Sequence, residues 1–443
     1  MQTSTNQSIK PVTAEINELG NLSIGGCDLV ELAKKYETPL YVLDETTLIS
    51  ICKDYKEAFS AYKNVNMMYA SKALCTLATS AILADEGFGF DVVSAGEMYT
   101  VYKAGADMKK VLFNGNNKSI SELTLALELG VGRISVDNFL ELSLLNVLAK
   151  SMNKTAEILL RITPGIECHT HEYIQTGHLD SKFGFDLTQI DEAVNLILDE
   201  YSNLTLRGLH AHIGSQIFET KVYHDEIEIL VKELARLDEK FGLKLDEINI
   251  GGGLGVKYTE SDCPPSTYEI ACVIIKSLNS SVQKYGIGYP TLFIEPGRSI
   301  ISTAGVTLYT IGSSKQVPNG KKYFAVDGGM ADNARPSMYK AEYTASVANK
   351  PDAETSQSVT IAGRFCESGD ILIHNIELPE LEEGDILCVY NTGAYNYSMA
   401  SNYNRVQKPA MVLVNNSQSD IIIERETLDD LISHDRIPDR LKK

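Results

Sequence analysis

The segment EINIGGGLG, residues 247–255, shows the pattern that decides the fold: a short β-branched run is followed at once by glycines. Outward from this segment, between about residue 46 and residue 298, short apolar runs alternate with segments of helical periodicity. This alternation is typical of βα units that build a parallel sheet. Strands are expected at residues 66–70, 89–93, 110–113, 133–136, 158–162, 206–210, 247–250 and 292–295. Eight such strands predict a closed (β/α)8 barrel of the TIM type.

The helices between these strands have local support in the sequence. Ser119 followed by Glu122 is the pattern of a capping box. Ile120, Leu123 and Leu127 share one helical face, and Gly130 stands where a helix commonly ends. We therefore expect a helix between Ser119 and Gly130.

After residue 298 the pattern changes to short strands punctuated by Gly, Asn and Pro, which predicts an all-β second domain. Strands are expected there at residues 305–311, 322–326, 358–361, 371–374, 386–390, 411–414 and 421–423. The first 45 residues are also strand-like and turn-like, and we expect them to join that domain. The predicted domains are therefore a cofactor-binding barrel over residues 46–303 and a β domain built from residues 1–45 and 304–443.

The composition excludes several classes of function. Hydrophobic residues make up 44% and charged residues 22%, and the formal net charge is −19. A chain this acidic repels polyanions, so we expect neither nucleic acid nor a membrane as a partner. The eight cysteines form no CxxC pair, no apolar run approaches about 18 residues, and the start MQTSTNQSIK is polar. We therefore expect a reduced, cytoplasmic protein.

In a barrel of this kind the active site lies at the C-terminal ends of the strands. The motif YASK, residues 69–72, puts Lys72 at the end of the first strand. A lone lysine is usually a solvated surface charge. Burial at a barrel mouth, however, lowers the pKa of the amine and lets it form a Schiff base with a carbonyl group.

Two further motifs suggest an anion site. HAHIGSQ, residues 210–216, ends the sixth strand, and the glycines of residues 251–255 end the seventh. Consecutive glycines let backbone amides approach an anion, and a following helix adds its positive end, although such a run can also form only a tight turn. The run lacks the Gly-Lys-Ser/Thr of a nucleotide P-loop and does not follow the first strand, as a dinucleotide fingerprint would. A small phosphate ester fits better.

The eighth strand ends in EPGR, residues 295–298, with a carboxylate and a guanidinium. A lysine, a phosphate cradle and a carboxylate are the parts that pyridoxal 5'-phosphate needs. The lysine holds the aldehyde as an imine, and the carboxylate keeps the pyridine nitrogen protonated. A protonated ring is the strong electron sink that loss of carbon dioxide requires, whereas a racemase works with a weaker one.

Further motifs extend this set through the chain. They are FNGNNKS (113–119), PGIECHTHEYIQTG (164–177), DSKFGF (180–185), DGGMADNARPSMY (327–339), CESGD (366–370), GAY (393–395) and SNYN (401–404). With these motifs, residues 69–409 resemble the diaminopimelate decarboxylase family, in the alanine-racemase-like barrel class of pyridoxal-phosphate enzymes.

The resemblance implies a role for each matched residue. The cofactor-binding residues would be Lys72, His212, Ser215, Gly252, Gly253, Glu295, Gly297, Arg298 and Tyr395, with Lys72 as the imine lysine, His212 stacked on the ring and Glu295 facing the pyridine nitrogen. The substrate-binding residues would be Arg298, Arg335, Tyr339, Glu367 and Tyr395. The arginines would hold the distal carboxylate, because a guanidinium binds a planar anion in a bidentate manner. The catalytic residues would be Lys72, His212 and Cys366. Of these, Cys366 would reprotonate the α-carbon after carbon dioxide leaves.

Each residue also has a structural explanation. Cys366 could be a small buried hydrophobe, Arg335 part of a surface turn and His212 a structural histidine. Tyr395 could be a core residue and Glu367 a solvated charge. Their joint occurrence beside a complete cofactor set favours the functional interpretation.

Two groups of residues are open to either interpretation. Asp91 and Glu97, near the end of the second strand, either support the site or are structural. His169, His171 and His178 suggest a metal site at first sight, but no carboxylate and cysteine pattern at ligand spacing accompanies them. We therefore expect no metal and interpret their segment as a mobile lid over the pocket.

The sequence departs from the family pattern in two places. Ala-Leu-Cys follows Lys72, where many members have Ala-Asn, and Asn114 stands where a histidine is common. Neither departure removes a proposed functional group, but both bear on the shape of the pocket.

The resemblance implies conversion of meso-2,6-diaminopimelate to L-lysine and carbon dioxide, the last step of lysine biosynthesis, by a homodimer whose β domains contribute to shared active sites. One alternative is a decarboxylase of carboxynorspermidine, ornithine or arginine on the same scaffold. Those substrates lack a distal amino-acid group, so Arg335, Tyr339 and Glu367 count against them. Another alternative is a non-catalytic homologue that acts as a binding protein, which the presence of Lys72 and Cys366 disfavours.

Overall fold

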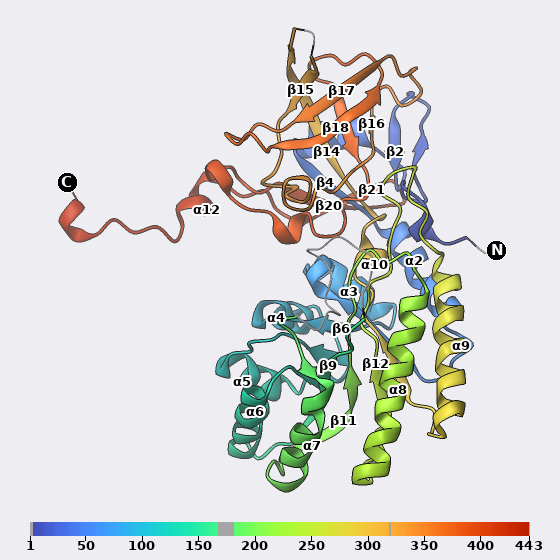
Figure 1. Ribbon diagram of the computed structural model, residues 1–443. Coiled ribbons are helices and arrows are strands. Elements are labelled where there is room, and N and C mark those ends of the chain that lie inside the picture. Colours follow the sequence, from blue (N-terminus) through green and yellow to red (C-terminus); the bar gives the residue numbers. More distant parts are fainter. Residues whose placement is uncertain (1–2, 167–180, 319, 443) are drawn as a thin grey trace. The chain divides into compact units, whose positions relative to one another are not determined.

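The computed structural model describes residues 3–166, 181–318 and 320–442. The chain divides into two compact units. The barrel unit comprises Met1–Ser8 and Leu48–Ile301, and the β unit comprises Ile9–Thr47 and Ser302–Lys443. Each unit therefore combines segments from distant parts of the sequence, as the colours of Figure 1 show.

The barrel unit contains a closed ring of eight parallel strands. These strands are β5 (Val65–Ala70), β6 (Gly89–Val92), β7 (Val111–Phe113), β8 (Arg133–Val136), β9 (Ala156–Thr163), β11 (Leu204–His210), β12 (Glu247–Asn249) and β13 (Thr291–Ile294). Strand β13 pairs with β5, and β8 pairs with β9, so no edge of the ring is left open. A short strand, β10 (Phe185–Asp186), adds to β9. The predicted (β/α)8 fold is confirmed.

Helices lie on the outside of the ring (Figure 1); the first of them precedes β5, and the others follow the strands in turn. They are α2 (Glu45–Ala58), α3 (Leu77–Asp85), α4 (Ala95–Lys103), α5 (Ile120–Leu129), α6 (Phe139–Ser151), α7 (Ile190–Asp199), α8 (Lys221–Phe241) and α9 (Thr267–Tyr285). The predicted ends of α5 are confirmed: Ser119 caps the helix, Glu122 completes the capping box and Gly130 ends it with a left-handed φ of 71°. Leu123 and Leu127 are buried as expected, but Ile120, in the first turn, is exposed.

Apolar side chains pack together in the interior of the barrel. Met68, Leu112, Leu159 and Phe293, from four different strands, form one buried cluster. Side chains of this kind fill TIM-type barrels in layers, so the interior is a packed core and not a channel. Polar side chains that serve chemistry are therefore confined to the strand ends.

The β unit is built around a mixed nine-stranded sheet. Its strands are β4 (Leu40–Asp44), β14 (Gly305–Gln316), β15 (Lys322–Val326), β16 (Ala345–Val347), β17 (Gln357–Ala362), β18 (Ile371–Leu378), β19 (Ile386–Val389), β20 (Ala410–Asn415) and β21 (Gln418–Ile423). Strand β4 pairs antiparallel with β14 and parallel with β20. The segment Ile9–Thr47 therefore belongs with the C-terminal third, as predicted for the fold. The start of the chain, also expected there, clusters instead with the barrel unit, where Asn6 donates to the carbonyl oxygens of Gly255 and Pro265. Strand β16, which pairs with β19, has no counterpart in the sequence prediction.

Smaller elements complete the β unit. A three-stranded sheet combines β1 (Glu15–Ile16), β2 (Leu22–Ile24) and β3 (Cys27–Asp28), followed by α1 (Leu29–Tyr36). The short helices α11 (Arg335–Tyr339) and α12 (Leu428–Ile432) lie in the C-terminal third. Among the described residues, no helix combines the length and the apolarity that crossing a membrane requires.

One buried acid in the barrel unit has a thermodynamic consequence. Glu226 on α8 is 0% exposed, and neither carboxyl oxygen has a hydrogen-bond partner among the described residues. Burial, and then the charge of Glu295, raise the pKa of Glu226 well above its usual range. Folding therefore takes up a proton at this site at neutral pH.

We expect Glu226→Gln to flatten the pH dependence of stability. The folded pKa of Glu226 is raised, so the free energy of unfolding falls as the pH rises above the unfolded pKa. One proton gives a slope of about 1.4 kcal/mol per pH unit, which Glu226→Gln should remove between pH 5 and pH 7. Urea unfolding at three pH values measures this slope. Glu239→Gln, at an exposed position of the same helix, is the control, and equal slopes in wild type and Glu226→Gln would contradict the assignment.

Candidate active site

The segments singled out in the barrel sequence follow four neighbouring strands. Lys72 follows β5, the 210–216 motif follows β11, the glycine run follows β12 and the EPGR segment follows β13. These strands are adjacent in the order β11, β12, β13, β5. Because parallel strands end at the same rim, the structure brings these segments together in one sector of the barrel mouth.

Lys72 lies on the 3₁₀ turn η2 (Ser71–Ala73), directly after β5. Ser71 and Ala73 are buried, whereas the side chain of Lys72 is exposed. The expected burial of this lysine is therefore wrong: the turn buries the residues on either side and leaves Lys72 accessible beside the acids of the barrel mouth. Its charge still reaches the site: burial raises the pKa of Glu97, and Lys72 opposes that rise.

The glycine run packs too closely against its neighbours for a side chain. A Cβ on Gly252 would lie 2.2 Å from the carbonyl oxygen of Glu295. Gly253 has a φ of +103°, and a Cβ there would lie 2.8 Å from the carbonyl oxygen of Gly214. The helix expected directly after the glycines is absent, since α9 begins at Thr267. No helix N-terminus in this described stretch therefore adds to the backbone amides of the run.

Gln216 joins this run to the preceding loop. Its Nε2 donates to the carbonyl oxygen of Val256 at 2.7 Å, and its Oε1 accepts from the N–H of Val256 at 3.1 Å. The N–H of Ile217 donates to the carbonyl oxygen of Gly253 at 2.9 Å. The hydroxyl of Tyr223 donates to the carbonyl oxygen of Gly252 at 3.3 Å. The two loops therefore form one preorganised surface.

His212 lies between these loops. Its Nδ1 accepts from the N–H of Gly252 at 3.3 Å. Burial, and then the charges of Lys72 and Arg161, hold the pKa of His212 well below its usual value. The ring is therefore neutral at pH 7, with the hydrogen-bond acceptor on Nδ1.

Glu295 is a buried carboxylate at the end of β13. Its Oε1 accepts from Nδ2 of Asn249 at 2.7 Å, and Nε2 of His210 lies 3.5 Å away. Burial alone would raise the pKa of Glu295, but the basic groups that face it, His210, His212 and Lys72, lower it. Glu295 is therefore ionised at neutral pH and suited to face a cationic ring nitrogen.

Arg298 begins α10 (Arg298–Ile301), directly after the EPGR turn, and is buried. Its Nη2 donates to Oγ of Ser215 at 3.0 Å, and its Nη1 donates to the hydroxyl of Tyr258 at 2.9 Å. A Cβ on Gly297 would lie 2.9 Å from that of Ala70, so the turn packs tightly on β5.

Asp91, near the end of β6, and Glu97, in the first turn of the helix that follows β6, lie on the same side of the barrel. Asp91, in β6, is buried, and Oδ1 accepts from Nδ2 of Asn114 at 2.6 Å. Glu97 is on α4 and accepts from the N–H of Val93 at 2.8 Å. Burial, and then the charge of Glu295, raise the pKa of Asp91. Asp91 and Glu97 therefore belong to the electrostatic surroundings of Lys72.

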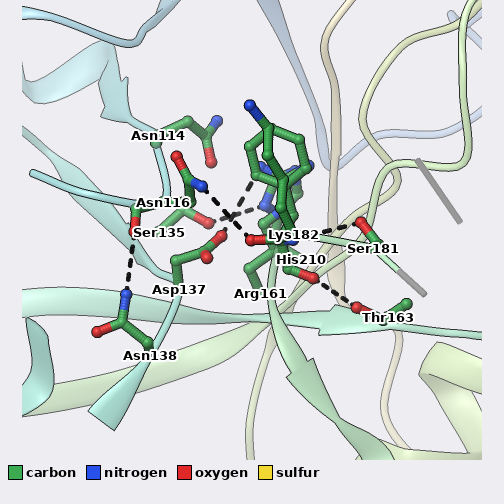
Figure 2. A network of polar contacts seen from close by, with 12 residues as sticks. Asn114, Asn116, Ser135, Asp137, Asn138, Arg161, Thr163, Ser181, Lys182 and His210 are labelled. Atoms are coloured by element: carbon green, nitrogen blue, oxygen red, sulfur yellow. Dashed lines mark hydrogen bonds and ion pairs between the residues drawn. The ribbon is translucent and has the colours of Figure 1, made fainter. Parts of the chain in front are cut away.

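A second polar network continues from this sector across β8, β9 and β11 (Figure 2). Oγ of Ser135 lies 2.8 Å from Nδ1 of His210, and Arg161 lies 3.9 Å from Asp137 and over the ring of Phe183. The sequence interpretation gave these residues no role. Their position at the C-terminal ends of predicted strands was the available signal.

The remaining predicted site residues belong to the β unit. Arg335 opens α11, is 7% exposed and donates from Nη1 to the hydroxyl of Tyr343 at 2.7 Å. Tyr339, at the end of α11, is half-buried, and Tyr395 is half-buried with a φ of 63°.

Cys366 and Glu367 occupy one exposed loop of the β unit. The N–H of Cys366 donates to Oδ1 of Asn404, which lies in the SNYN motif, at 3.0 Å. The structural explanation of Cys366 as a buried hydrophobe is therefore wrong. The histidines 169, 171 and 178 lie outside the described residues, and elsewhere no group of three or more potential metal ligands occurs.

The barrel site fits pyridoxal phosphate. A close-packed backbone loop can admit a phosphate, an exposed lysine stands at a neighbouring strand end, and an ionised buried carboxylate lies between them. These features define a pyridoxal-phosphate-dependent barrel enzyme. A family model described as "Pyridoxal-dependent decarboxylase, pyridoxal binding domain" matches residues 46–302, more than half of the chain.

Curated relatives narrow the class. A diaminopimelate decarboxylase of Synechocystis sp. is 49% identical over 99% of this chain and 95% of its own length. The enzyme of that name from Bacillus subtilis is 46% identical, over 96% of this chain and 97% of its own. The crystal structure of diaminopimelate decarboxylase from M. jannaschii matches with a TM-score of 0.92 and 36% identity, over 98% of this chain and 99% of that one. The chain belongs to the diaminopimelate decarboxylase family of pyridoxal-phosphate-dependent amino-acid decarboxylases.

Proposed function

We propose that the protein removes one carboxyl group of meso-2,6-diaminopimelate and releases L-lysine and carbon dioxide. The observation that carries this proposal is the set of lysine, glycine cradle and ionised carboxylate at neighbouring strand ends, in a chain 49% identical to a diaminopimelate decarboxylase. A structure of the M. jannaschii relative is a complex with L-lysine, which is the product proposed here.

The barrel residues would hold pyridoxal phosphate. Lys72 would bind its aldehyde, and Ser215, Gly252 and Gly253, with Gly297 and Arg298 beside them, would bind its phosphate. When bound, the cofactor supplies an electron-withdrawing ring that accepts the electron pair left as carbon dioxide departs. Two side chains of the protein would control the protonation of that ring.

Glu295 and His212 would exert this control. Glu295 is ionised, so it would hold a proton on the ring nitrogen and keep the ring electron-poor. His212 is neutral and bonded to Gly252, so it would offer a flat, uncharged face against the ring. A charged imidazole there would compete with the proton on the ring nitrogen.

The β unit would supply the substrate end of the site. Arg335 and Tyr339, with Arg298, would hold the distal carboxylate, and Glu367 would receive the distal amine. Cys366 would deliver a proton from Sγ to the α-carbon after carbon dioxide leaves, and a proton from solvent would restore the thiol. Tyr395 would contact both substrate and cofactor.

We also propose a homodimer with shared active sites, in which Lys72 of one subunit works with Cys366 of its partner. Lys72→Ala and Cys366→Ala should each be inactive and should complement each other when mixed after dissociation. Random reassembly gives about half mixed dimers with one intact site of two, so activity should approach about a quarter of wild type. Mixed dimers that form without restoring activity would show that both residues act within one chain.

We expect Gly252→Ala to weaken cofactor binding about tenfold or more. The added Cβ would meet the carbonyl oxygen of Glu295 at 2.2 Å, so the backbone of the cradle must shift. The dissociation constant of pyridoxal phosphate, measured by absorbance, tests this. Gly288→Ala is the control, because a Cβ there meets nothing within 4 Å. An unchanged dissociation constant in folded Gly252→Ala would remove the glycine run from the phosphate site.

The proposed function is tested by adding candidate amino acids to the protein loaded with pyridoxal phosphate. We expect the absorbance band of the bound cofactor to change with diaminopimelate, followed by turnover, and not with ornithine or arginine. Turnover of ornithine or arginine instead would favour the alternative decarboxylases. No response to any amino acid would favour a binding protein.

The seven described cysteines are all free, which supports a reducing compartment such as the cytoplasm.

A further inference from the structure

Two buried acids meet at the mouth of the barrel. Asp91, in β6, is 2% exposed, and Glu295, directly after β13, is 6% exposed. The side chain of Asn114, directly after β7, lies with them and is 4% exposed. Three strand ends therefore direct two carboxyl groups and one amide into the same buried volume.

The amide of Asn114 contacts both acids. Its Nδ2 lies 2.6 Å from Oδ1 of Asp91 and 3.3 Å from Oε1 of Glu295. An amide nitrogen carries two hydrogens, so it can donate to both carboxyl groups at once.

A second amide fixes which oxygen of Glu295 is used. Nδ2 of Asn249 donates to the same Oε1 at 2.7 Å. The orientation of Asn249 is set by its Oδ1, which accepts from the N–H of Gly251 at 2.8 Å. Oε1 of Glu295 therefore receives two amide donors, whereas Asp91 receives one from Asn114.

The charged groups around the two acids are unequal. Glu295 faces the basic side chains of His210, His212 and Lys72. Asp91 faces two acids, Glu295 and Glu97, against Lys72, with Arg161 further along the network. Two buried carboxylates joined by one nitrogen repel each other, so the member with fewer amide donors and a further acid, Glu97, beside it keeps the proton.

We propose that Asn114 is a positioning residue: its amide couples Asp91 to Glu295, so that the pair retains one proton, held by Asp91, and Glu295 remains the ionised member. The directions of the two pKa shifts agree with this arrangement, raised for Asp91 and lowered for Glu295. The consequence, which rests on the proposed function, is that the charge opposite the cofactor ring is set partly by a residue three strands further around the barrel.

Infrared spectroscopy of the full-length protein loaded with pyridoxal phosphate tests this proposal. A protonated buried carboxyl group has its own carbonyl stretch, which disappears on ionisation. The spectral change with pH is recorded for wild type and for Asp91→Asn, and the second difference spectrum is subtracted from the first. The bands of other buried acids, such as Glu226 and Asp332, occur in both proteins and cancel, so the carbonyl band of Asp91 remains. We expect a band of protonated Asp91 at neutral pH.

The decisive variant is Asn114→Leu, of similar size but without donors. Losing a donor disfavours the ionised form, so the midpoint at which the Asp91 band disappears should rise by about one pH unit or more. Asn114→Ala, which cannot clash, should shift it in the same direction if the leucine variant folds poorly. Asn349→Leu is the control, because its amide donates to Asp385 in the β unit, and it should leave the midpoint unchanged.

Two results would overturn the proposal. Absence of any Asp91 carboxyl band at neutral pH in wild type would show that the pair does not hold its proton there. An unchanged midpoint in the Asn114 variants, with or without a lower melting temperature, would show that Asn114 is only structural.

Discussion

Lys72→Ala is expected to lower kcat for diaminopimelate by at least about a thousandfold, because it removes the group that would bind the cofactor covalently. The fold should survive. Lys72 is exposed on a short turn, so its removal leaves no cavity in the core. Circular dichroism and thermal melting measure the fold, and steady-state assays with excess pyridoxal phosphate measure kcat.

Borohydride reduction gives an independent readout of the same residue. In wild type it should attach the cofactor to the peptide that contains Lys72, as shown by mass spectrometry. Lys150→Ala, at an exposed position of α6, is the matched control and should retain both label and activity. A label on a different lysine would contradict the assignment of Lys72.

Arg335→Ala is expected to lower kcat/KM for diaminopimelate by about a hundredfold to a thousandfold, with the cofactor still bound. The variant would remove the proposed charge-assisted contact to the distal carboxylate, and losing one partner of a buried charge pair costs about 2–5 kcal/mol. Arg335 is nearly fully buried and is held by the hydroxyl of Tyr343, so its guanidinium is preorganised. The test compares diaminopimelate with lysine, which lacks that carboxylate.

The matched control is Arg405→Ala in the same unit. Arg405 forms an exposed ion pair with Asp435, which contributes little, so activity and cofactor content should stay near wild type. If Arg335→Ala leaves the preference for diaminopimelate over lysine unchanged, Arg335 does not bind the distal carboxylate.

The barrel and its cofactor segments could be predicted because their signals are local. Each strand was visible as an apolar run, and parallel strands must end at one rim, so Lys72 and Glu295 could be placed at the barrel mouth before any contact was known. The capping box of α5 was equally local. Strand β16 was missed because it has only three residues and depends on pairing with β19.

The polar residues that adjust the site could not be assigned in the same way. Asn249 and Asn114 stand 46 and 181 residues from Glu295 in sequence, so only the closed barrel brings them to its carboxylate. The exposure of Lys72 likewise depends on how a short turn leaves β5. Sequence patterns identify which residues reach the rim, but not which of them share a proton there.

The most direct test of the proposed activity is product analysis with meso-2,6-diaminopimelate as the only amino acid. With pyridoxal phosphate bound, the purified protein should release carbon dioxide and L-lysine in equal amounts, and neither should form after the cofactor is removed. Carbon dioxide without lysine, or no consumption of diaminopimelate by folded, cofactor-loaded protein, would contradict the assignment of a diaminopimelate decarboxylase activity.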